Sequence, residues 1–246
     1  MSTDWVRPNT ILLGEFGSGA QGTATADSDT DQIGIAIEPA EYIIGLGRFD
    51  QATHRGQDEH VASKPGDVEG VTYSLRKWAR LASEGSPNLL SAVYLPQYDI
   101  LTPAGEKLVN NREMFLSKIT AGRYLGYLMD QRNSLLGLKS AKKHRPELVS
   151  KYGFDTKYAY HMLRVGIQGM HLLTTGHLPM PLVGDELSLL RAVRAGKVSL
   201  DECITLAGQY ETELEALKSS SILPDTADLT AIDALLVSMY QAHWAA

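Results

Sequence analysis

Cysteine is almost absent from this sequence, since Cys203 is the only one among 246 residues. A single thiol cannot form an internal disulfide, and it cannot build a thiolate cluster for a metal ion. No run of about 18 apolar residues occurs either, so a membrane-spanning helix is not expected. The segment from Met1 to Trp5 lacks the basic and apolar parts of a signal peptide. Together these absences predict a cytoplasmic protein with no membrane partner.

Positive charge is also in short supply. The 23 lysines and arginines are outnumbered by 29 acidic residues, which gives a formal net charge of −6. This balance argues against a protein that coats duplex DNA non-specifically, although it leaves room for a local basic site. With 43% hydrophobic residues, the chain has the composition of a globular protein large enough for a sizeable core.

The first hundred residues have the pattern of a small mixed sheet. Apolar and polar residues alternate in Gln32–Ile37 and again in Glu69–Tyr73, as they do in strands. The second stretch runs directly into Ser74–Leu81, whose spacing predicts a helix. Between the two, Arg48–Gly66 is polar and contains glycine, and it is interpreted as a loop.

The rest of the chain has helical spacing. Capping and breaking residues bound four candidate helices: Arg112–Leu136, Asp155–Thr175, Ser199–Lys218 and Ala227–Trp244. The predicted class is therefore α+β, with a mixed-sheet catalytic domain over residues 1–105 and an all-helical domain over residues 106–246.

A glycine-rich turn followed by acids carries the candidate chemistry. The segment Gly17–Gly22 satisfies G-x-G-x-x-G, but a dinucleotide-binding fold would need a long helix after it, and here a strand follows. The pair Gly17 and Ser18 instead offers backbone N–H groups and a hydroxyl to phosphate oxygens, with no bulky side chain in the way.

Asp29 and Asp31 lie two residues apart at the start of a predicted strand, so both carboxylates point to the same face. Taken alone, such a pair is as often a solvated turn as a site. Beside a phosphate-type turn it favours Mg²⁺, with Mn²⁺ as an alternative, because hard cations take carboxylate oxygens. Glu69, at the start of the next strand, is the first choice for a third carboxylate, and Asp67 is the second.

The motif Gly17-Ser18 followed by Asp29-x-Asp31 and a strand resembles the signature of the polymerase-beta-like nucleotidyltransferase superfamily. Four further stretches are similar to a branch of predicted nucleotidyltransferases associated with RNA repair, some of which sit beside RNA ligases. They are Asp27–Asp31, Tyr73–Trp78, Ser86–Leu90 and Arg145–Arg164. The likeness covers roughly residues 10 to 200.

The resemblance implies that Ser18 grips the terminal phosphates of a nucleotide and that Asp29 and Asp31 bind the metals. It assigns the third acid to Glu69, where most relatives carry aspartate. Gly19 stands where relatives often have arginine, and losing that cation would weaken triphosphate binding. These two departures leave open a retuned or impaired enzyme.

A polar stripe marks the predicted helix over Asp155–Thr175. It consists of Lys157, His161, Arg164, Gln168 and His171 at helical spacing. Periodicity alone favours a solvated face, whereas the resemblance favours nucleotide binding by Lys157, His161 and Arg164. Further basic residues gather nearby in the sequence: Lys139, Lys142, Lys143, Arg145 and Lys151.

The sequence therefore predicts a metal-dependent nucleotidyltransferase that uses a nucleoside triphosphate, such as ATP, and releases pyrophosphate. An RNA 3′ end is the first choice of acceptor, on the basis of the resemblance alone. The alternatives are nucleotidylation of a small molecule or protein, and an impaired nucleotide-binding regulator. The sequence leaves the base preference, the use of a template and the oligomeric state open.

Overall fold

A five-stranded mixed sheet forms the base of the first part of the chain. The computed structural model describes residues 3–25, 28–55, 68–138 and 145–245. The strand order is β3-β4-β2-β1-β5, with β2 and β4 parallel and the other pairs antiparallel. The strands are β1 (Thr10–Phe16), β2 (Thr30–Ala36), β3 (Gln51–Arg55), β4 (Val68–Ser74) and β5 (Ile100–Leu101).

Helix α2 (Leu75–Ser83) continues directly from β4 and packs on the sheet. Ser74 caps it, because the Ser74 hydroxyl accepts a hydrogen bond from a backbone N–H of the first turn. On the buried face of α2, the Trp78 indole donates to the carbonyl oxygen of Leu89 at 2.8 Å. The Trp78 ring also meets Phe115 edge-on, with centroids 4.9 Å apart. These contacts hold α2, the helix that follows the strand of the predicted third carboxylate, Glu69.

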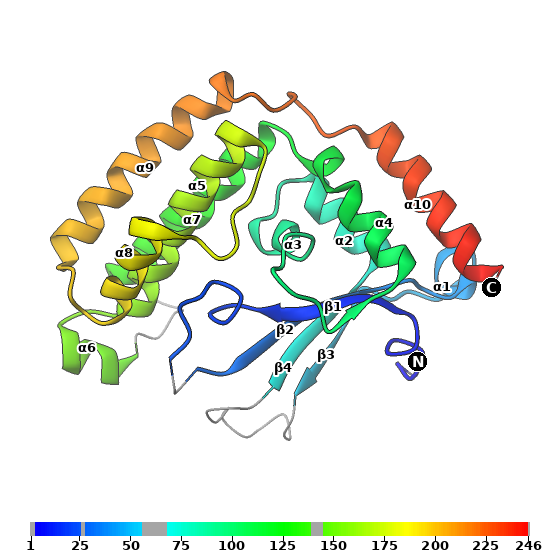
Figure 1. Ribbon diagram of the computed structural model, residues 1–246, viewed down its shortest axis with the longest axis horizontal. Coiled ribbons are helices and arrows are strands. Elements are labelled where there is room, and N and C mark those ends of the chain that lie inside the picture. The colour runs from blue at the N-terminus through cyan, green and yellow to red at the C-terminus, as the bar shows by residue number, and fades with distance from the viewer. Residues whose placement is uncertain (1–2, 26–27, 56–67, 139–144, 246) are drawn as a thin grey trace. The chain divides into compact units, whose positions relative to one another are not determined.

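The remaining helices near the sheet are short, except for the last one. They are α1 (Ala40–Ile43), α3 (Pro87–Ser91), α4 (Pro103–Asn110), the 3₁₀ helix η1 (Arg112–Phe115) and α10 (Leu229–Trp244). Figure 1 shows α2 and α4 on the same side of the sheet. Among the described helices, none is both long enough and apolar enough to cross a bilayer.

Helix α10 is held to the sheet through the buried Glu38, which follows β2. The Tyr240 hydroxyl donates to Oε2 of Glu38 at 2.6 Å, and the backbone N–H of Leu75 donates to the same oxygen at 3.1 Å. The Trp244 indole donates to the carbonyl oxygen of Glu38 at 2.9 Å. Because Glu38 is only 1% exposed, the Tyr240 hydroxyl and the Leu75 N–H replace the water that its Oε2 atom loses on folding.

Replacing Tyr240 with phenylalanine should lower the free energy of unfolding by about 1.5–3 kcal/mol, the usual cost of removing a hydrogen bond to a charged group. The phenyl ring keeps the packing, so the loss reports on the Glu38 carboxylate. Urea denaturation followed by circular dichroism measures it. Tyr127→Phe, at a half-buried tyrosine of α5 (Ile119–Leu135), is the control. Equal stability of the two variants would contradict a stabilising hydrogen bond between Tyr240 and Glu38.

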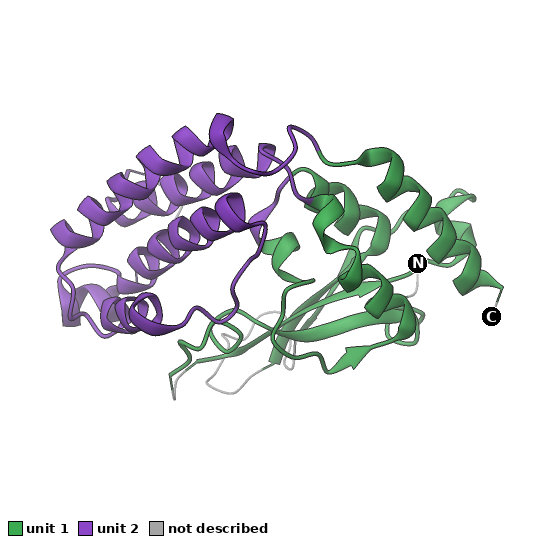
Figure 2. Ribbon diagram, turned by 45° about the horizontal axis from the view of Figure 1, so that its top comes forward, with its two compact units in different colours: residues 1–84, 88–115, 227–246 green, residues 85–87, 116–226 purple. Residues whose placement is uncertain are grey.

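The chain divides into two compact units, drawn in different colours in Figure 2. The first comprises residues 1–84, 88–115 and 227–246, and the second comprises residues 85–87 and 116–226. The sequence predicts a single domain boundary at residue 105, with the last helix in the helical domain. Helix α10 groups with the sheet because of its contacts with Glu38, which lies about 200 residues earlier and which no local pattern reveals.

The second unit is all helical. Its helices are α5 (Ile119–Leu135), α6 (Pro146–Tyr152), α7 (Thr156–Thr175), α8 (Gly184–Arg194) and α9 (Leu200–Ser220). Helices α5, α7 and α9 pack against one another, and a methyl group on Gly169 of α7 would lie 2.7 Å from the ring of Tyr124 on α5. The predicted capping box is present, since Ser199 and Glu202 bond each other's backbone. The predicted α+β class is thus confirmed.

Two local predictions were wrong. The stretch Arg112–Leu136 is not one helix, because η1 ends at Phe115 and α5 begins at Ile119. At the break, the Lys118 N–H donates to the carbonyl oxygen of Pro224, a distant partner that competes with helical bonding. The predicted loop contains strand β3, which is stabilised by pairing with β4. Part of that loop, residues 56–67, lies outside the described residues.

Candidate active site

Strand β1 ends in a closed turn that carries the predicted phosphate-binding residues. Gly17 has a φ of 73°, a left-handed conformation that glycine adopts without strain. The backbone N–H of Gln21 donates to the carbonyl oxygen of Gly17 at 3.2 Å, and that of Thr23 donates to the carbonyl oxygen of Ser18 at 2.9 Å. The chain therefore turns back on itself with Ser18 half-exposed within the turn.

The carboxylate of Asp31 lies against this turn. A methyl group added to Gly17 would stand 2.6 Å from Oδ2 of Asp31, much closer than a van der Waals contact. Glycine is thus required here for two reasons, the backbone conformation and the space that the carboxylate occupies. The structure therefore brings Asp31 and the Gly17–Ser18 turn together.

Asp31 and Glu69 are cross-strand neighbours. They pair in the parallel register of β2 and β4, so their side chains share a face and their strands are about 4.8 Å apart. Phe16 pairs with Asp31 on the other side and extends this row. A cavity of about 270 Å³ lies over the row. It is lined by Phe16, Asp31, Gln32, Thr53, His54, Glu69, Gly70 and Val71.

Asp29 is less closely joined to this pair. It precedes the first residue of β2 and is half-exposed, so the pleat of the strand does not fix its direction. Among the described residues, no three histidine, cysteine or acidic side chains are close enough to form a ready metal site. The structure therefore brings together Asp31 and Glu69 but does not bring the Asp29 carboxylate to them. Like charges repel, so three carboxylates are not expected to gather without a cation. The alternative third acid, Asp67, lies outside the described residues.

Gly19 has a structural explanation. The carboxylate of Glu15 occupies the position where a side chain at residue 19 would begin. An arginine at that position would enter only after Glu15 had moved. Glu15 points to the opposite face of β1 from Phe16, because successive side chains of a strand alternate. The chain thus has an acid beside Gly19, the position at which the sequence resemblance implies an arginine.

The polar stripe on α7 is exposed at Lys157, half-buried at His161 and His171, and buried between them. Arg164 and Gln168 are only 6% and 2% exposed. The Arg164 guanidinium donates to Oε1 of Gln168 at 2.8 Å, and the Gln168 amide donates to the carbonyl oxygen of Pro179 at 3.1 Å. The solvated face that periodicity alone favours therefore does not extend to Arg164 and Gln168, because helical spacing groups these residues without revealing that neighbouring segments cover them.

His161 lies among cations on the same helix. Its Nδ1 atom is buried and has no hydrogen-bond partner among the described residues. Burial is the main cause that lowers its pKa well below 6.5, and nearby positive charges lower it further. In order of effect, these charges are Arg164, Lys157, Arg145 and Arg194. His161 is therefore neutral at pH 7 in a positively charged environment that suits an anion.

Arg145 and Arg194 complete this cationic cluster, and each is held by a specific contact. Arg145 forms an ion pair at 3.1 Å with Asp155, the fully buried residue that caps α7. Arg194 lies over the ring of Tyr160, 5.3 Å from its centroid. The sequence analysis did not single out Arg194, since an arginine in the last turn of a helix is ordinary. Lys139, Lys142 and Lys143 lie outside the described residues.

The lowered pKa of His161 gives an expected pH dependence. The folded chain binds a proton at His161 more weakly than the unfolded chain does. The contribution of neutral His161 to the free energy of unfolding is therefore fully present above about pH 6.5. It is lost as the pH falls through the pKa that His161 has in the folded chain. His161→Gln should weaken this acid dependence in urea denaturation between about pH 7 and 5. His177→Gln, at an exposed histidine, is the control, and an unchanged slope for His161→Gln would contradict the expectation.

Comparison with known proteins gives a family and two relatives. The model of the family described as the RNA repair pathway DNA polymerase beta family matches residues 5–238. An uncharacterized 38.9 kDa protein from the nrdC-mobD intergenic region of Enterobacteria phage T4 is 27% identical over 138 residues. These residues cover 54% of this chain and 40% of that relative, so the match spans less than half of its length.

A solved structure was also found. It is a nucleotidyltransferase-like protein from Exiguobacterium sibiricum, which is 13% identical to this chain. The match covers 87% of this chain and 70% of the other, with a TM-score of 0.32.

Proposed function

This chain belongs to the RNA repair pathway DNA polymerase beta family, and we propose that it is a nucleotidyltransferase that adds a nucleotidyl group to the 3′-hydroxyl of RNA. The observation that carries the proposal is the row in which Asp31 and Glu69 are register neighbours, with the Asp31 carboxylate against Gly17. Acids beside a phosphate-type turn can hold a divalent ion next to the phosphates of a nucleotide, which suits a reaction at phosphorus.

The proposed metal ligands are Asp29, Asp31 and Glu69. The donor set fits Mg²⁺ or Mn²⁺, because carboxylate oxygens are hard ligands and Asp31 and Glu69 are adjacent on one face. A divalent ion bound there would neutralise phosphate charge and lower the pKa of the attacking hydroxyl. Asp29 is half-exposed and directly precedes β2, so its side chain can turn toward the pair.

The other residues of the site bind and orient the nucleoside triphosphate. The hydroxyl of Ser18 and the N–H groups of its turn that precede Gln21 are donors for the terminal phosphates. The acceptor oxygen attacks the α-phosphorus in line, the bond to the β-phosphate breaks, and pyrophosphate leaves. The protein contributes position and charge neutralisation rather than a covalent intermediate.

Lys157, His161 and Arg164, all on α7, are proposed to bind phosphate groups of a nucleotide. The cations around His161 favour an anionic ligand, and a neutral imidazole can donate one hydrogen bond to it. Arginine suits this role because its planar fork matches the geometry of phosphate oxygens. We assign His161 to positioning, since a divalent ion can activate the hydroxyl.

A primer-extension assay tests the acceptor. The chain is incubated with Mg²⁺, each labelled nucleoside triphosphate in turn and single-stranded RNAs that end in a 3′-hydroxyl or a 3′-phosphate. RNA lengthened only from the 3′-hydroxyl supports the proposal. Label on a small molecule or on protein, without lengthened RNA, would move the acceptor to those classes. Nucleotide binding with no pyrophosphate release would instead favour an impaired regulator, for which the carboxylate of Glu15 beside Gly19 is the supporting observation.

A further inference from the structure

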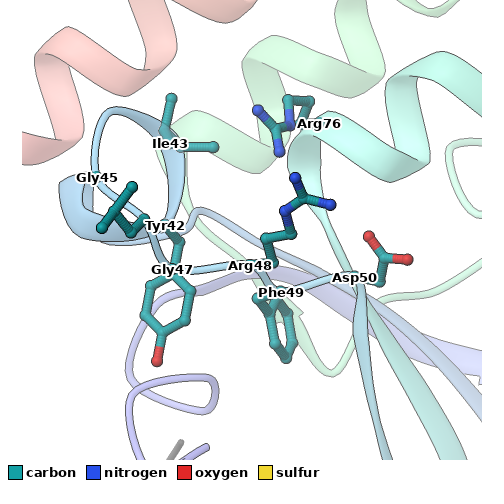
Figure 3. Close-up of a pocket in the computed structure, with 9 residues that line it drawn as sticks. Tyr42, Ile43, Gly45, Gly47, Arg48, Phe49, Asp50 and Arg76 are labelled. Carbon is teal, nitrogen blue, oxygen red and sulfur yellow. The ribbon is translucent and has the colours of Figure 1, made fainter.

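A second cavity lies in the first unit, where the segment after α1 leads into β3. It has a volume of about 400 Å³, within the range of small-ligand sites. Figure 3 shows the side chains that line it. The lining residues are Tyr42, Ile43, Gly45, Leu46, Gly47, Arg48, Phe49, Asp50 and Arg76.

Packing holds the wall of this cavity in place. The backbone N–H of Gly47 donates to the carbonyl oxygen of Glu41 at 3.1 Å, and a methyl group on Gly45 would stand 2.5 Å from the same oxygen. The ring of Phe49 meets Trp5 edge-on with centroids 4.6 Å apart, and Tyr42 lies 5.1 Å from Trp5. The segment is therefore anchored at both ends, on α1 and on an aromatic cluster.

Two arginines face this cavity. In Figure 3 the guanidinium groups of Arg48 and Arg76 point toward each other. Within the described part of the chain, neither side chain has a hydrogen bond or ion pair. Asp50 also lines the cavity, but it pairs with Lys77 at 3.4 Å. Two positive groups aimed at one space repel each other, and an anion between them would reverse the sign of that interaction.

The cavity is separate from the carboxylate row. Glu69 lies near the start of β4, whereas Arg76 follows the end of that strand at Ser74. Five residue steps of strand separate Glu69 from Ser74, which is about 17 Å. A phosphate group held by Arg76 therefore cannot be the one that reacts beside Glu69.

We propose that the cavity between Arg48 and Arg76 is a second binding site, specific for a phosphate group. One guanidinium fork is enough for a carboxylate, while two forks match the several oxygens and the higher charge of a phosphate. The phosphate comes either from a free nucleotide or pyrophosphate, or from the end of an RNA strand. The inference does not depend on the proposed function, because it uses neither the carboxylates nor α7.

Isothermal titration calorimetry tests the site with the full-length chain in the presence of EDTA, which suppresses metal-dependent binding at the carboxylates. The titrants are pyrophosphate and two short single-stranded RNAs of the same sequence, one with a 5′-phosphate and one with a 5′-hydroxyl. The test variant is the double substitution Arg48→Gln and Arg76→Gln. Arg80→Gln is the control, since Arg80 lies one turn further along α2 and is exposed, as Arg48 and Arg76 are, but does not line the cavity.

The double variant should bind the phosphate ligand at least about tenfold more weakly than the wild type, and Arg80→Gln should bind it within about twofold. Loss of pyrophosphate binding in the double variant identifies a free nucleotide or pyrophosphate as the ligand. Loss confined to the 5′-phosphorylated RNA identifies an RNA end. The proposal is overturned if the wild type binds neither pyrophosphate nor the 5′-phosphorylated RNA below about 1 mM, or if the double variant and Arg80→Gln bind these ligands equally.

Discussion

Asp31→Asn should lower the rate of nucleotidyl transfer by roughly 100- to 1000-fold, the range seen when one electrostatic contact to a transition state is removed. Asparagine keeps the size of the side chain beside Gly17 but loses the negative charge that a divalent ion needs. Single-turnover measurement of pyrophosphate release at saturating triphosphate reports this step. Because Asp31 is exposed, the free energy of unfolding should stay within about 0.5 kcal/mol of the wild type.

Asp233→Asn is the matched control for this variant. Asp233 is exposed on α10, away from the carboxylate row, and its replacement by asparagine removes the same negative charge. Equal rates for the wild type and Asp31→Asn would remove the proposed mechanism. A partial rescue of Asp31→Asn by raising the Mg²⁺ concentration would strengthen it, because weaker metal binding is then the cause of the loss.

Gly17→Ala should have the second largest effect, at least about 100-fold on the same rate, although alanine removes no functional group. The added methyl group would stand 2.6 Å from Oδ2 of Asp31, so the carboxylate has to move. A displacement of about 1 Å can cost this much in an enzyme that works by positioning. The left-handed conformation adds a cost of about 1–2 kcal/mol to the folded state. Transfer assays and urea denaturation measure the two effects separately.

Gly184→Ala separates the backbone conformation from the contact. Gly184 has a φ of 60°, and a methyl group there would meet nothing within 4 Å. The variant should lose a similar amount of stability and keep its activity. If Gly17→Ala also keeps its activity while losing stability, then the contact between Gly17 and Asp31 does not matter for the reaction.

Local patterns predicted the parts of the fold whose stabilising partners are near in sequence. Alternation located β2 and β4, and the capping residues at Ser199 and Asp155 located the starts of α9 and α7. Strand β3 was missed because a polar strand depends on its neighbour, here β4, for its hydrogen bonds. For the same reason, spacing could not show that Arg164 and Gln168 are buried, since the carbonyl oxygen that accepts from Gln168 belongs to Pro179, outside α7.

The sequence by itself determined the chemistry that is available: a Gly17-Ser18 turn, acids at Asp29 and Asp31 with the period of a strand, and cations spaced along one helix. The tertiary structure decided which of these groups meet. It made Asp31 and Glu69 neighbours through the parallel pairing of strands 38 residues apart in sequence, and it left Asp29 outside the pair. It also turned Arg48 and Arg76 toward one cavity. Such pairings depend on non-local packing, so the spacing of residues within one segment does not encode them.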